Sequence, residues 1–385
     1  HFQRTTFFPS MQGNVHEEEP AANPRQLPLS AFHESLGAKF TAFAGWEMPV
    51  AYGSSVEEHL ACRRAAAAFD VSHMGELDVT GPEAGRFLDY ALTNLVSSVA
   101  PGRAVYSPLC GEDGGTLDDL IAYKRAEEEY FLCVNASNAE ADFAHLAALS
   151  EGFSCEVANR SASYGQLAVQ GPEAEAIVSQ VVQRELGGVE KMSFREFEAF
   201  GERVLLARSG YTGEDGFELY CPVAALETCV EALSASGASS GLTWAGLAAR
   251  DGLRLEAGFP LHGHELSASI TPLQAGLRWA VNWEKPGGFV GREALLRERE
   301  GGPAGRLAHY VAEGRRIPRD GAVVTRGGEE LGRVTSGGYS PLLEKPVGTV
   351  WLRADAWPER RAEGWEAQVR GNGVPLHFGK PALRR

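Results

Sequence analysis

Residues 79–92, VTGPEAGRFLDYAL, return in altered form at residues 169–182, VQGPEAEAIVSQVV. Both segments end an apolar strand, pass through Gly-Pro-Glu-Ala and enter an amphipathic helix. Proline suits the first helical turn, where its missing N–H costs nothing, and the following glutamate favours the positive end of the helix dipole. Two such units about 90 residues apart predict a duplicated α+β module. The alternative is a common strand-to-helix turn that occurs twice.

Strand and helix patterns continue on both sides of the two copies. The further predicted strands are residues 103–109, 117–124, 130–134, 197–208 and 217–221. A helix is expected to start near Ser137, with Glu140 placed for a capping box. Residues 241–256 predict another helix that ends at Gly258, a residue suited to a left-handed C-terminal cap. Two interleaved α/β domains are therefore expected over residues 29–285.

This pattern changes at residues 283–288, WEKPGG, where proline and glycine interrupt it. Short apolar strands follow, and glycine pairs are expected to separate them. The predicted strands are 322–325, 331–336, 347–352 and 367–369, and the glycine pairs are 327–328 and 337–338. Such spacing is typical of a small antiparallel barrel or sandwich. Residues 286–385 are therefore expected to form a C-terminal β domain.

Length and composition exclude several classes of protein. A chain of 385 residues predicts two or three domains. Lys and Arg number 36 and Asp and Glu 51, so the net charge is −15, which argues against nucleic-acid binding. No apolar run is long enough to predict a membrane span. The sequence has no phosphate-binding glycine loop and no metal-spaced histidines, so neither a nucleotide cofactor nor a metal is predicted.

The N-terminus and the cysteines bear on location. Residues 1–28 are expected to be a poorly ordered extension, because they combine an acidic run and four prolines with no apolar period. The six cysteines are Cys62, Cys110, Cys133, Cys155, Cys221 and Cys229. They form no C-x-x-C pair, so free buried thiols are expected, with a nucleophilic cysteine as the alternative. This favours a reducing compartment: the cytoplasm, or the mitochondrial matrix in a eukaryote.

Four segments combine glycine with charged or polar side chains. They are GGTLDDLI at 114–121, VNAS at 134–137, SGYTGEDGFE at 209–218 and GLAARDGLRLE at 246–256. In the first, the strand period places Asp118 and Asp119 on opposite faces. At least one is expected to point inward, where a carboxylate needs a partner or a function. A hairpin cap is the alternative.

The other three segments each leave two interpretations open. Asn135 ends a strand, where it either binds a ligand or leads into the next helix. Glu218 shares a strand face with Tyr220, either toward a pocket or on a solvent-facing hairpin. Arg250 and Arg254 lie four residues apart on one helix face, where a guanidinium would pair with Glu218, with a ligand carboxylate or in a structural ion pair.

Taken in order and spacing, these segments resemble the aminomethyltransferase of the glycine cleavage system, the T-protein family. The resemblance runs from about Leu29 almost to the C-terminus. It also includes FAGWEMPV at 43–50, FDVSHM at 69–74, TP at 271–272 and VTSG at 334–337. It implies an α+β fold: a three-domain cloverleaf of two ferredoxin-like α/β domains and a C-terminal antiparallel β-barrel.

The resemblance also implies that tetrahydrofolate binds in the central hole of the cloverleaf. Asp119 is then the catalytic residue, in contact with the folate near its reactive amines. A glutamate grips the pterin in this family, which here is Glu218, and the arginine toward the folate tail is Arg250. The other implied binding residues are Met74, Tyr106, Asn135, Tyr211 and Trp279.

The implied reaction starts from an aminomethyl group on the lipoyl arm of H-protein, the implied partner. The enzyme releases ammonia and transfers the one-carbon unit to tetrahydrofolate, which becomes 5,10-methylenetetrahydrofolate. No nucleic acid or membrane takes part. The sequence departs from the family pattern where Leu261-His262-Gly263 replaces Leu-Tyr-Gly, and where Cys133 replaces a common valine. A basic residue common in relatives is also missing after Asn135.

Two other functions compete with this one. The first is a related tetrahydrofolate-dependent demethylase, or the folate domain of a sarcosine- or dimethylglycine-oxidising enzyme, which usually carries a flavin-binding domain. The second is the non-catalytic folate-binding factor of iron–sulfur assembly. That family shows a cysteine in a Lys-Gly-Cys-Tyr-type motif, whereas residues 285–293 read KPGGFVGRE here, which favours the transferase.

Overall fold

The computed structural model describes residues 24–237 and 240–384. Most of the predicted N-terminal extension lies outside the described residues. Its last part forms strand β1 (Arg25–Gln26), which pairs in parallel with β3 (Trp46–Ala51), and Leu27 is buried. Strand β2 (Lys39–Phe43) completes this small sheet, beside helices α1 (Ser30–Ser35) and α2 (Ser55–Arg64).

A five-stranded antiparallel sheet holds the first copy of the repeat. Its order is β6-β7-β8-β5-β9. The strands are β5 (Gly75–Thr80), β6 (Arg103–Cys110), β7 (Thr116–Ala126), β8 (Glu129–Val134) and β9 (Glu156–Asn159). Helices α3 (Ala84–Ala91) and α4 (Ala139–Ser150) pack against one face and bury the apolar core there.

A six-stranded sheet holds the second copy, in the order β11-β12-β13-β10-β4-β14. The strands are β4 (Ala66–Asp70), β10 (Tyr164–Gln170), β11 (Phe194–Ala199), β12 (Glu202–Ala207), β13 (Gly216–Pro222) and β14 (Leu242–Trp244). Helices α5 (Ala174–Val182) and α6 (Val223–Gly237) cover its outer face. Because β4 precedes the whole first sheet in the chain, the two units are interleaved.

The two Gly-Pro-Glu-Ala segments occupy equivalent places, so the prediction of two similar units is confirmed. Strands β5 and β10 are each followed by a glycine with positive φ, 124° at Gly81 and 131° at Gly171. In both, the glycine N–H donates to a carbonyl of the hairpin beside it, Glu128 O and Asp215 O. A Cβ at either position would come within 3.0 Å of backbone oxygen, so only glycine fits this strand-to-helix turn.

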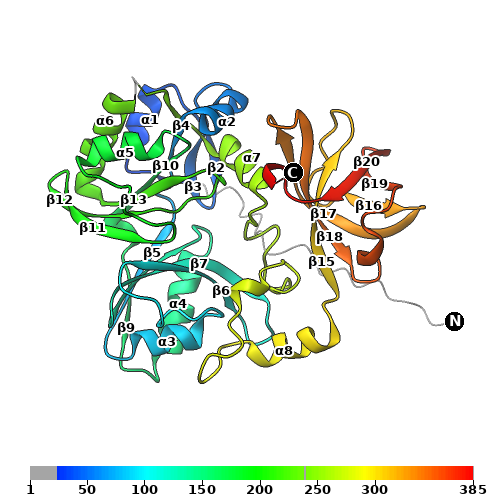
Figure 1. Ribbon diagram of the computed structural model, residues 1–385, viewed down its shortest axis with the longest axis horizontal. Coiled ribbons are helices and arrows are strands. Elements are labelled where there is room, and N and C mark those ends of the chain that lie inside the picture. The colour runs from blue at the N-terminus through cyan, green and yellow to red at the C-terminus, as the bar shows by residue number, and fades with distance from the viewer. Residues whose placement is uncertain (1–23, 238–239, 385) are drawn as a thin grey trace.

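The two sheets pack face to face, with their helices on the outside (Figure 1). Between them lies a cluster of large side chains, in which Tyr123 of β7 and Tyr220 of β13 join their hydroxyls at 2.9 Å. At one edge, Ala104 N donates to Met192 O and Phe194 N to Gly102 O. The main chain therefore links the two sheets directly, and the strand ends that carry the polar segments come together.

The C-terminal domain is a closed antiparallel barrel in the order β15-β18-β17-β16-β19-β20. Its strands are β15 (Gly305–Ala312), β16 (Val323–Arg326), β17 (Glu329–Ser340), β18 (Lys345–Arg353), β19 (Trp365–Val369) and β20 (Asn372–Gly379). Helix α7 (Leu247–Ala257) lies between the second sheet and the barrel, and α8 (Arg292–Gly301) leads into the barrel (Figure 1). This confirms the α+β class with a C-terminal barrel.

Two predicted elements of the α/β part are wrong. Residues 197–208 are not one strand, because the chain turns at Phe200 and Gly201, both with positive φ, to make the β11–β12 hairpin. Residues 241–256 are not one helix, because 242–244 form strand β14 beside β4. Tertiary pairing overrides the local helical spacing there.

Two finer predictions are also wrong. Helix α4 has Asn138 at its N-cap with no side-chain cap hydrogen bond, so the expected capping box is absent there. Glu140 instead accepts a hydrogen bond from Asn159 at 3.4 Å. Gly337 and Gly338 do not separate strands but lie inside β17. A Cβ on Gly337 would come 1.7 Å from Pro318 O, so glycine serves a close backbone approach.

Among the described residues, no helix has both the length and the apolar character needed to span a membrane.

Candidate active site

The two aspartates are neighbours on β7 and differ in exposure. Asp118 is fully buried and Asp119 is half-buried. The Tyr106 hydroxyl donates to Asp119 Oδ2 at 2.9 Å, and Asn135 Nδ2 donates to Asp119 Oδ1 at 3.0 Å. Burial, and then repulsion from Asp118, raise the pKa of Asp119 to about 7, against the lowering effect of these two donors. A carboxyl with this pKa can exchange a proton at neutral pH.

Asn135 joins the two carboxyl groups. Its Nδ2 donates to Asp118 Oδ1 at 2.7 Å as well as to Asp119, and its backbone N–H donates to Asp118 Oδ2 at 3.0 Å. The residue also leads into α4, because its carbonyl accepts from Asn138 N. Helix entry, through its backbone, and site geometry, through its side chain, are therefore both served by this one residue.

Aromatic rings flank Asp119. Tyr106 stacks on Trp279, with ring centroids 5.4 Å apart and planes inclined by 27°. Trp279 belongs to the short helix η2 (Arg278–Ala280) and is 67% exposed, which is unusual for so large an apolar ring. The pair offers a flat surface on which a planar ring could stack.

Tyr211 and Arg250 form a second pair. The Arg250 guanidinium lies over the Tyr211 ring, 4.7 Å from its centroid. Tyr211 also stacks on Phe259 at 5.8 Å, and its hydroxyl donates to Pro260 O. Asp119 is near enough for its charge to act on the Tyr211 hydroxyl, whose pKa is raised mainly by burial. The Tyr211–Arg250 pair therefore lies near the group around Asp119.

Arg250 is half-buried, and its buried Nη1 has no hydrogen-bond partner among the described residues. Burial lowers the pKa of Arg250, and the nearby Glu218 opposes that effect. These two side chains do not form an ion pair, so Glu218 is not the direct partner that was one alternative. Arg254, one turn further along α7, instead pairs with Glu265 at 2.7 Å and Asp251 at 2.8 Å. The structural ion pair thus belongs to Arg254, and Arg250 is left with a donor to offer.

Glu218 is buried on β13, which rules out the solvent-facing hairpin. It accepts hydrogen bonds from Gln166 Nε2 at 3.1 Å and Ser209 Oγ at 2.5 Å. Met74 packs against the cluster between the sheets and against the cluster under α7. The site residues expected from the sequence therefore fall into a contacting group around Asp119 and the Arg250–Tyr211 pair. Glu218 lies near Arg250, and Met74 lies in the packing between the sheets.

Three side chains at this site were not picked out from the sequence. His73 is buried beside Arg250, and its Nδ1 has no hydrogen-bond partner among the described residues; burial, and then Arg250, lower its pKa to about 3. Asn138 Nδ2 donates to Asp118 Oδ1 at 2.8 Å. Asp142 is 3% exposed on α4. The detectable signal for Asp142 was its spacing from Ala139 and Leu146, which places it on the buried stripe of the helix.

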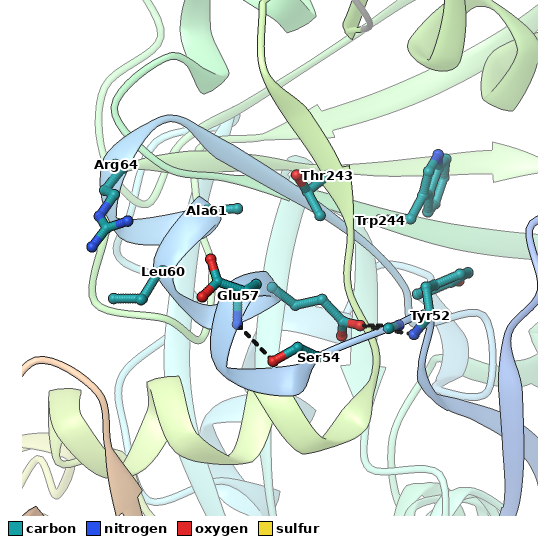
Figure 2. Close-up of a pocket in the computed structure, with 10 residues that line it drawn as sticks. Tyr52, Ser54, Glu57, Leu60, Ala61, Arg64, Thr243 and Trp244 are labelled. Atoms are coloured by element: carbon teal, nitrogen blue, oxygen red, sulfur yellow. Dashed lines mark hydrogen bonds between the residues drawn. The ribbon is translucent and has the colours of Figure 1, made fainter. Parts of the chain in front are cut away.

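A surface pocket elsewhere does not involve these residues. Figure 2 shows it between α2 and β14, lined by side chains that include Tyr52, Arg64 and Trp244. None of the expected site residues lines it. Across the described ranges, no group of three His, Cys, Asp or Glu side chains is arranged to hold a metal ion.

Comparison with known families adds to this geometry. Residues 29–285 match the GCVT N-terminal domain, and residues 306–383 match the glycine cleavage T-protein C-terminal barrel domain. An aminomethyltransferase of Streptomyces avermitilis is 46% identical over 94% of this chain and 98% of its own length. One of Thermus thermophilus is 46% identical over 91% of this chain and 96% of its own. The crystal structure of glycine cleavage system aminomethyltransferase T from Bartonella henselae matches with a TM-score of 0.87 and 38% identity, over 94% of this chain and 98% of that one.

Proposed function

The chain belongs to the glycine cleavage T-protein family of aminomethyltransferases, and from this premise we propose that it transfers a one-carbon unit from H-protein to tetrahydrofolate. The donor is the aminomethyl group on the lipoyl arm of H-protein. The observation that carries the proposal is Asp119, a half-buried carboxyl with a pKa of about 7 held between Tyr106 and Asn135.

The residues around Asp119 suit a folate. The unpartnered Nη1 of Arg250 can bind a carboxylate of the glutamate tail. Glu218 presents a carboxylate of the kind that accepts from a pterin amino group. The stacked faces of Tyr106 and Trp279 suit a flat ring. We infer that Met74, Tyr211 and Asn135 complete the walls of this site.

The reaction requires little more of the protein than to position the reactants and to stabilise developing charge. Two carbon–nitrogen bonds to the folate form, while the carbon–nitrogen bond to ammonia and the carbon–sulfur bond to the lipoyl arm break. The two folate N–H protons leave with the ammonia and the thiol. Asp119 orients the folate amines, stabilises the positive charge that develops on them and can accept a proton in transit.

Asp119→Asn tests this role. The purified protein is supplied with aminomethylated H-protein and tetrahydrofolate, and ammonia and methylenetetrahydrofolate are measured. We expect kcat to fall by about 10²–10⁴-fold, while folate affinity changes less than about threefold. Asp355→Asn, at the barrel surface, serves as the control and should keep full activity.

The same assay separates the competing functions. Native protein that releases no ammonia from H-protein, but demethylates a small amine in the presence of folate, would be a demethylase. Native protein that binds folate and turns over neither substrate would be an accessory factor. If Asp119→Asn lost folate affinity while turnover per bound folate stayed intact, Asp119 would have no catalytic role.

A further inference from the structure

Asp142 lies beneath the aspartate pair and is not explained by the proposed chemistry. It is 3% exposed, on the face of α4 that packs against the first sheet. Its Oδ2 is buried and receives no hydrogen bond from any described donor. Asp142 N donates to Asn138 O one turn back on α4, and Asn138 Nδ2 donates to Asp118 Oδ1 at 2.8 Å, so the Asp118 carboxyl lies against this turn, within hydrogen-bonding reach of Asp142. Two acceptors that face each other out of water need a proton between them.

The hydrogen bonds on Asp118 show which carboxyl holds the proton. Asp118 accepts three N–H bonds, from Asn135 Nδ2 at 2.7 Å, Asn138 Nδ2 at 2.8 Å and Asn135 N at 3.0 Å. An acceptor with three N–H donors is stabilised as the anion. Asp142 has no such donors, so it is the group that carries the proton.

We propose that Asp142 is a positioning residue, which stays protonated and donates its O–H to Asp118. The donation gives Asp118 a fourth donor and fixes it as the anchor for the Asn135 amide. The Asn135 amide also donates to Asp119, to the side-chain Oδ1 at 3.0 Å and to the backbone carbonyl of Asp119 at 3.1 Å. The proposal rests on the proposed function only in taking Asp119 as the catalytic carboxyl.

The charges around Asp142 agree with this assignment. From β7 it faces Asp118 and Asp119, both acidic, and His262 lies beyond Asn138, whose Nδ2 contacts His262 Nδ1 at 2.9 Å. Among the described residues, no Lys or Arg ion-pairs with Asp142. Burial, and then the Asp118 charge, raise the pKa of Asp142 well above its ordinary value. An ionised Asp142 would put two anions in direct contact and push Asp118 away from Asn135.

Two substitutions distinguish the two possible roles of Asp142, a protonated hydrogen-bond donor or an ionised carboxylate. Asp142→Asn retains an N–H donor without charge, so we expect kcat within about threefold of the native enzyme. Asp142→Leu keeps the volume but removes the donor, so kcat should fall at least about tenfold, with folate affinity changed less than threefold. Glu140→Gln, exposed on the same helix, is the matched control. If Asp142→Asn were as impaired as Asp142→Leu, the protonated-donor role would be wrong.

A second measurement does not depend on activity. A carboxyl whose pKa is raised in the folded state binds a proton that the unfolded chain has lost. The stability of the native protein should therefore fall as pH rises above the ordinary carboxyl range. The stability of the Asp142→Asn protein should fall less over the same range. Thermal unfolding of both proteins from pH 4 to pH 8 tests this. Parallel curves would mean an ionised Asp142 and overturn the proposal, even if Asp119 proved catalytic; divergent curves would support it even if the transferase assay failed.

Discussion

Asp119 accepts hydrogen bonds from Tyr106 and Asn135, and the Tyr106 hydroxyl can be removed by substitution without losing its ring. The Tyr106 hydroxyl donates to Oδ2 and lowers the pKa of Asp119, which burial and Asp118 raise to about 7. Tyr106→Phe removes that donor and keeps the ring that stacks on Trp279. The pKa of Asp119 should then rise, so the acid limb of the kcat–pH profile should move up by roughly 0.5–1 pH unit. Tyr90→Phe is the control. If the native protein, Tyr106→Phe and Tyr90→Phe gave the same kcat–pH profile, the Tyr106–Asp119 hydrogen bond would have no part in the titration.

Arg250 and Arg254 lie one helical turn apart, but we expect their substitution by alanine to affect different properties, folate binding for Arg250 and stability for Arg254. The Nη1 of Arg250 has no described partner, so Arg250→Ala should weaken folate binding at least about tenfold and leave the melting temperature nearly unchanged. Arg254 is 2% exposed and paired with Glu265, so Arg254→Ala should destabilise the protein by about 3–5 kcal/mol. Binding titration and thermal unfolding of the two variants check this; unchanged folate affinity in Arg250→Ala would contradict the binding role.

His262 stands where the family pattern has tyrosine, and the structure connects it to the aspartate pair. Asn138 Nδ2 contacts both Asp118 Oδ1 and His262 Nδ1, so its two hydrogens are used only if Nδ1 accepts. The other ring nitrogen, Nε2, then donates to Thr116 O at 3.2 Å. In this arrangement the ring supports the same Asp118 anchor as Asp142.

The part of the site that the sequence predicts is set by strand alternation and by the resemblance to the T-protein family. Asp118 and Asp119 fall on opposite faces because the period of a strand is two. Asp142 was missed because its partner is 24 residues away in sequence and no local pattern predicts that contact. His73 was missed because its burial depends on α7, which comes much later in the chain.

At the scale of elements, local signals predict a structure wherever they agree with tertiary pairing. The Gly-Pro-Glu-Ala turns were predicted because glycine and proline determine the backbone there. The β11–β12 hairpin was missed because Gly201 is the only typical turn residue there, Phe200 also takes a positive φ, and apolar residues continue on both sides of the turn. Strand β14 was missed because only its pairing with β4 distinguishes it from the start of a helix.

Helix α7 depends on one close approach. A Cβ on Gly246, at its N-cap, would lie 2.3 Å from Val50 C and 2.6 Å from Ala51 N of β3. Gly246→Ala should therefore displace the helix and destabilise the protein by about 1–3 kcal/mol, and folate affinity should fall because Arg250 moves with it. Gly53→Ala, whose Cβ would meet nothing within 4 Å, is the control. If the Gly246→Ala protein were as stable as the native protein, the steric argument would be contradicted.

For the molecule as a whole, the net charge of −15 opposes the approach of an anionic folate. The proposed site answers this with one local positive group, Arg250, rather than with a basic surface. Two buried glutamates, Glu256 in α7 and Glu265 after it, have a different role. Glu256 accepts from His59, Arg63 and Ser340, and Glu265 accepts from Arg254 and Thr349. They join the barrel to the α/β part through buried ionised groups.

Acid should therefore weaken this junction progressively as pH falls below the ordinary carboxyl pKa. The pKa values of Glu256 and Glu265 are each lowered to about 2, against burial: for Glu256 by hydrogen bonds and charge from His59, and for Glu265 chiefly by the Arg254 charge. A depressed folded-state pKa contributes stability that is present above the unfolded value, near 4.5, and lost as pH falls toward 2. Glu265→Gln should cost roughly 3 kcal/mol at pH 7, and the difference from native protein should shrink below pH 4. Denaturant unfolding of both proteins from pH 7 to pH 2.5 measures it, with Glu293→Gln on exposed α8 as the control. A constant difference across that range would mean that Glu265 stabilises the junction by packing and not by its charge.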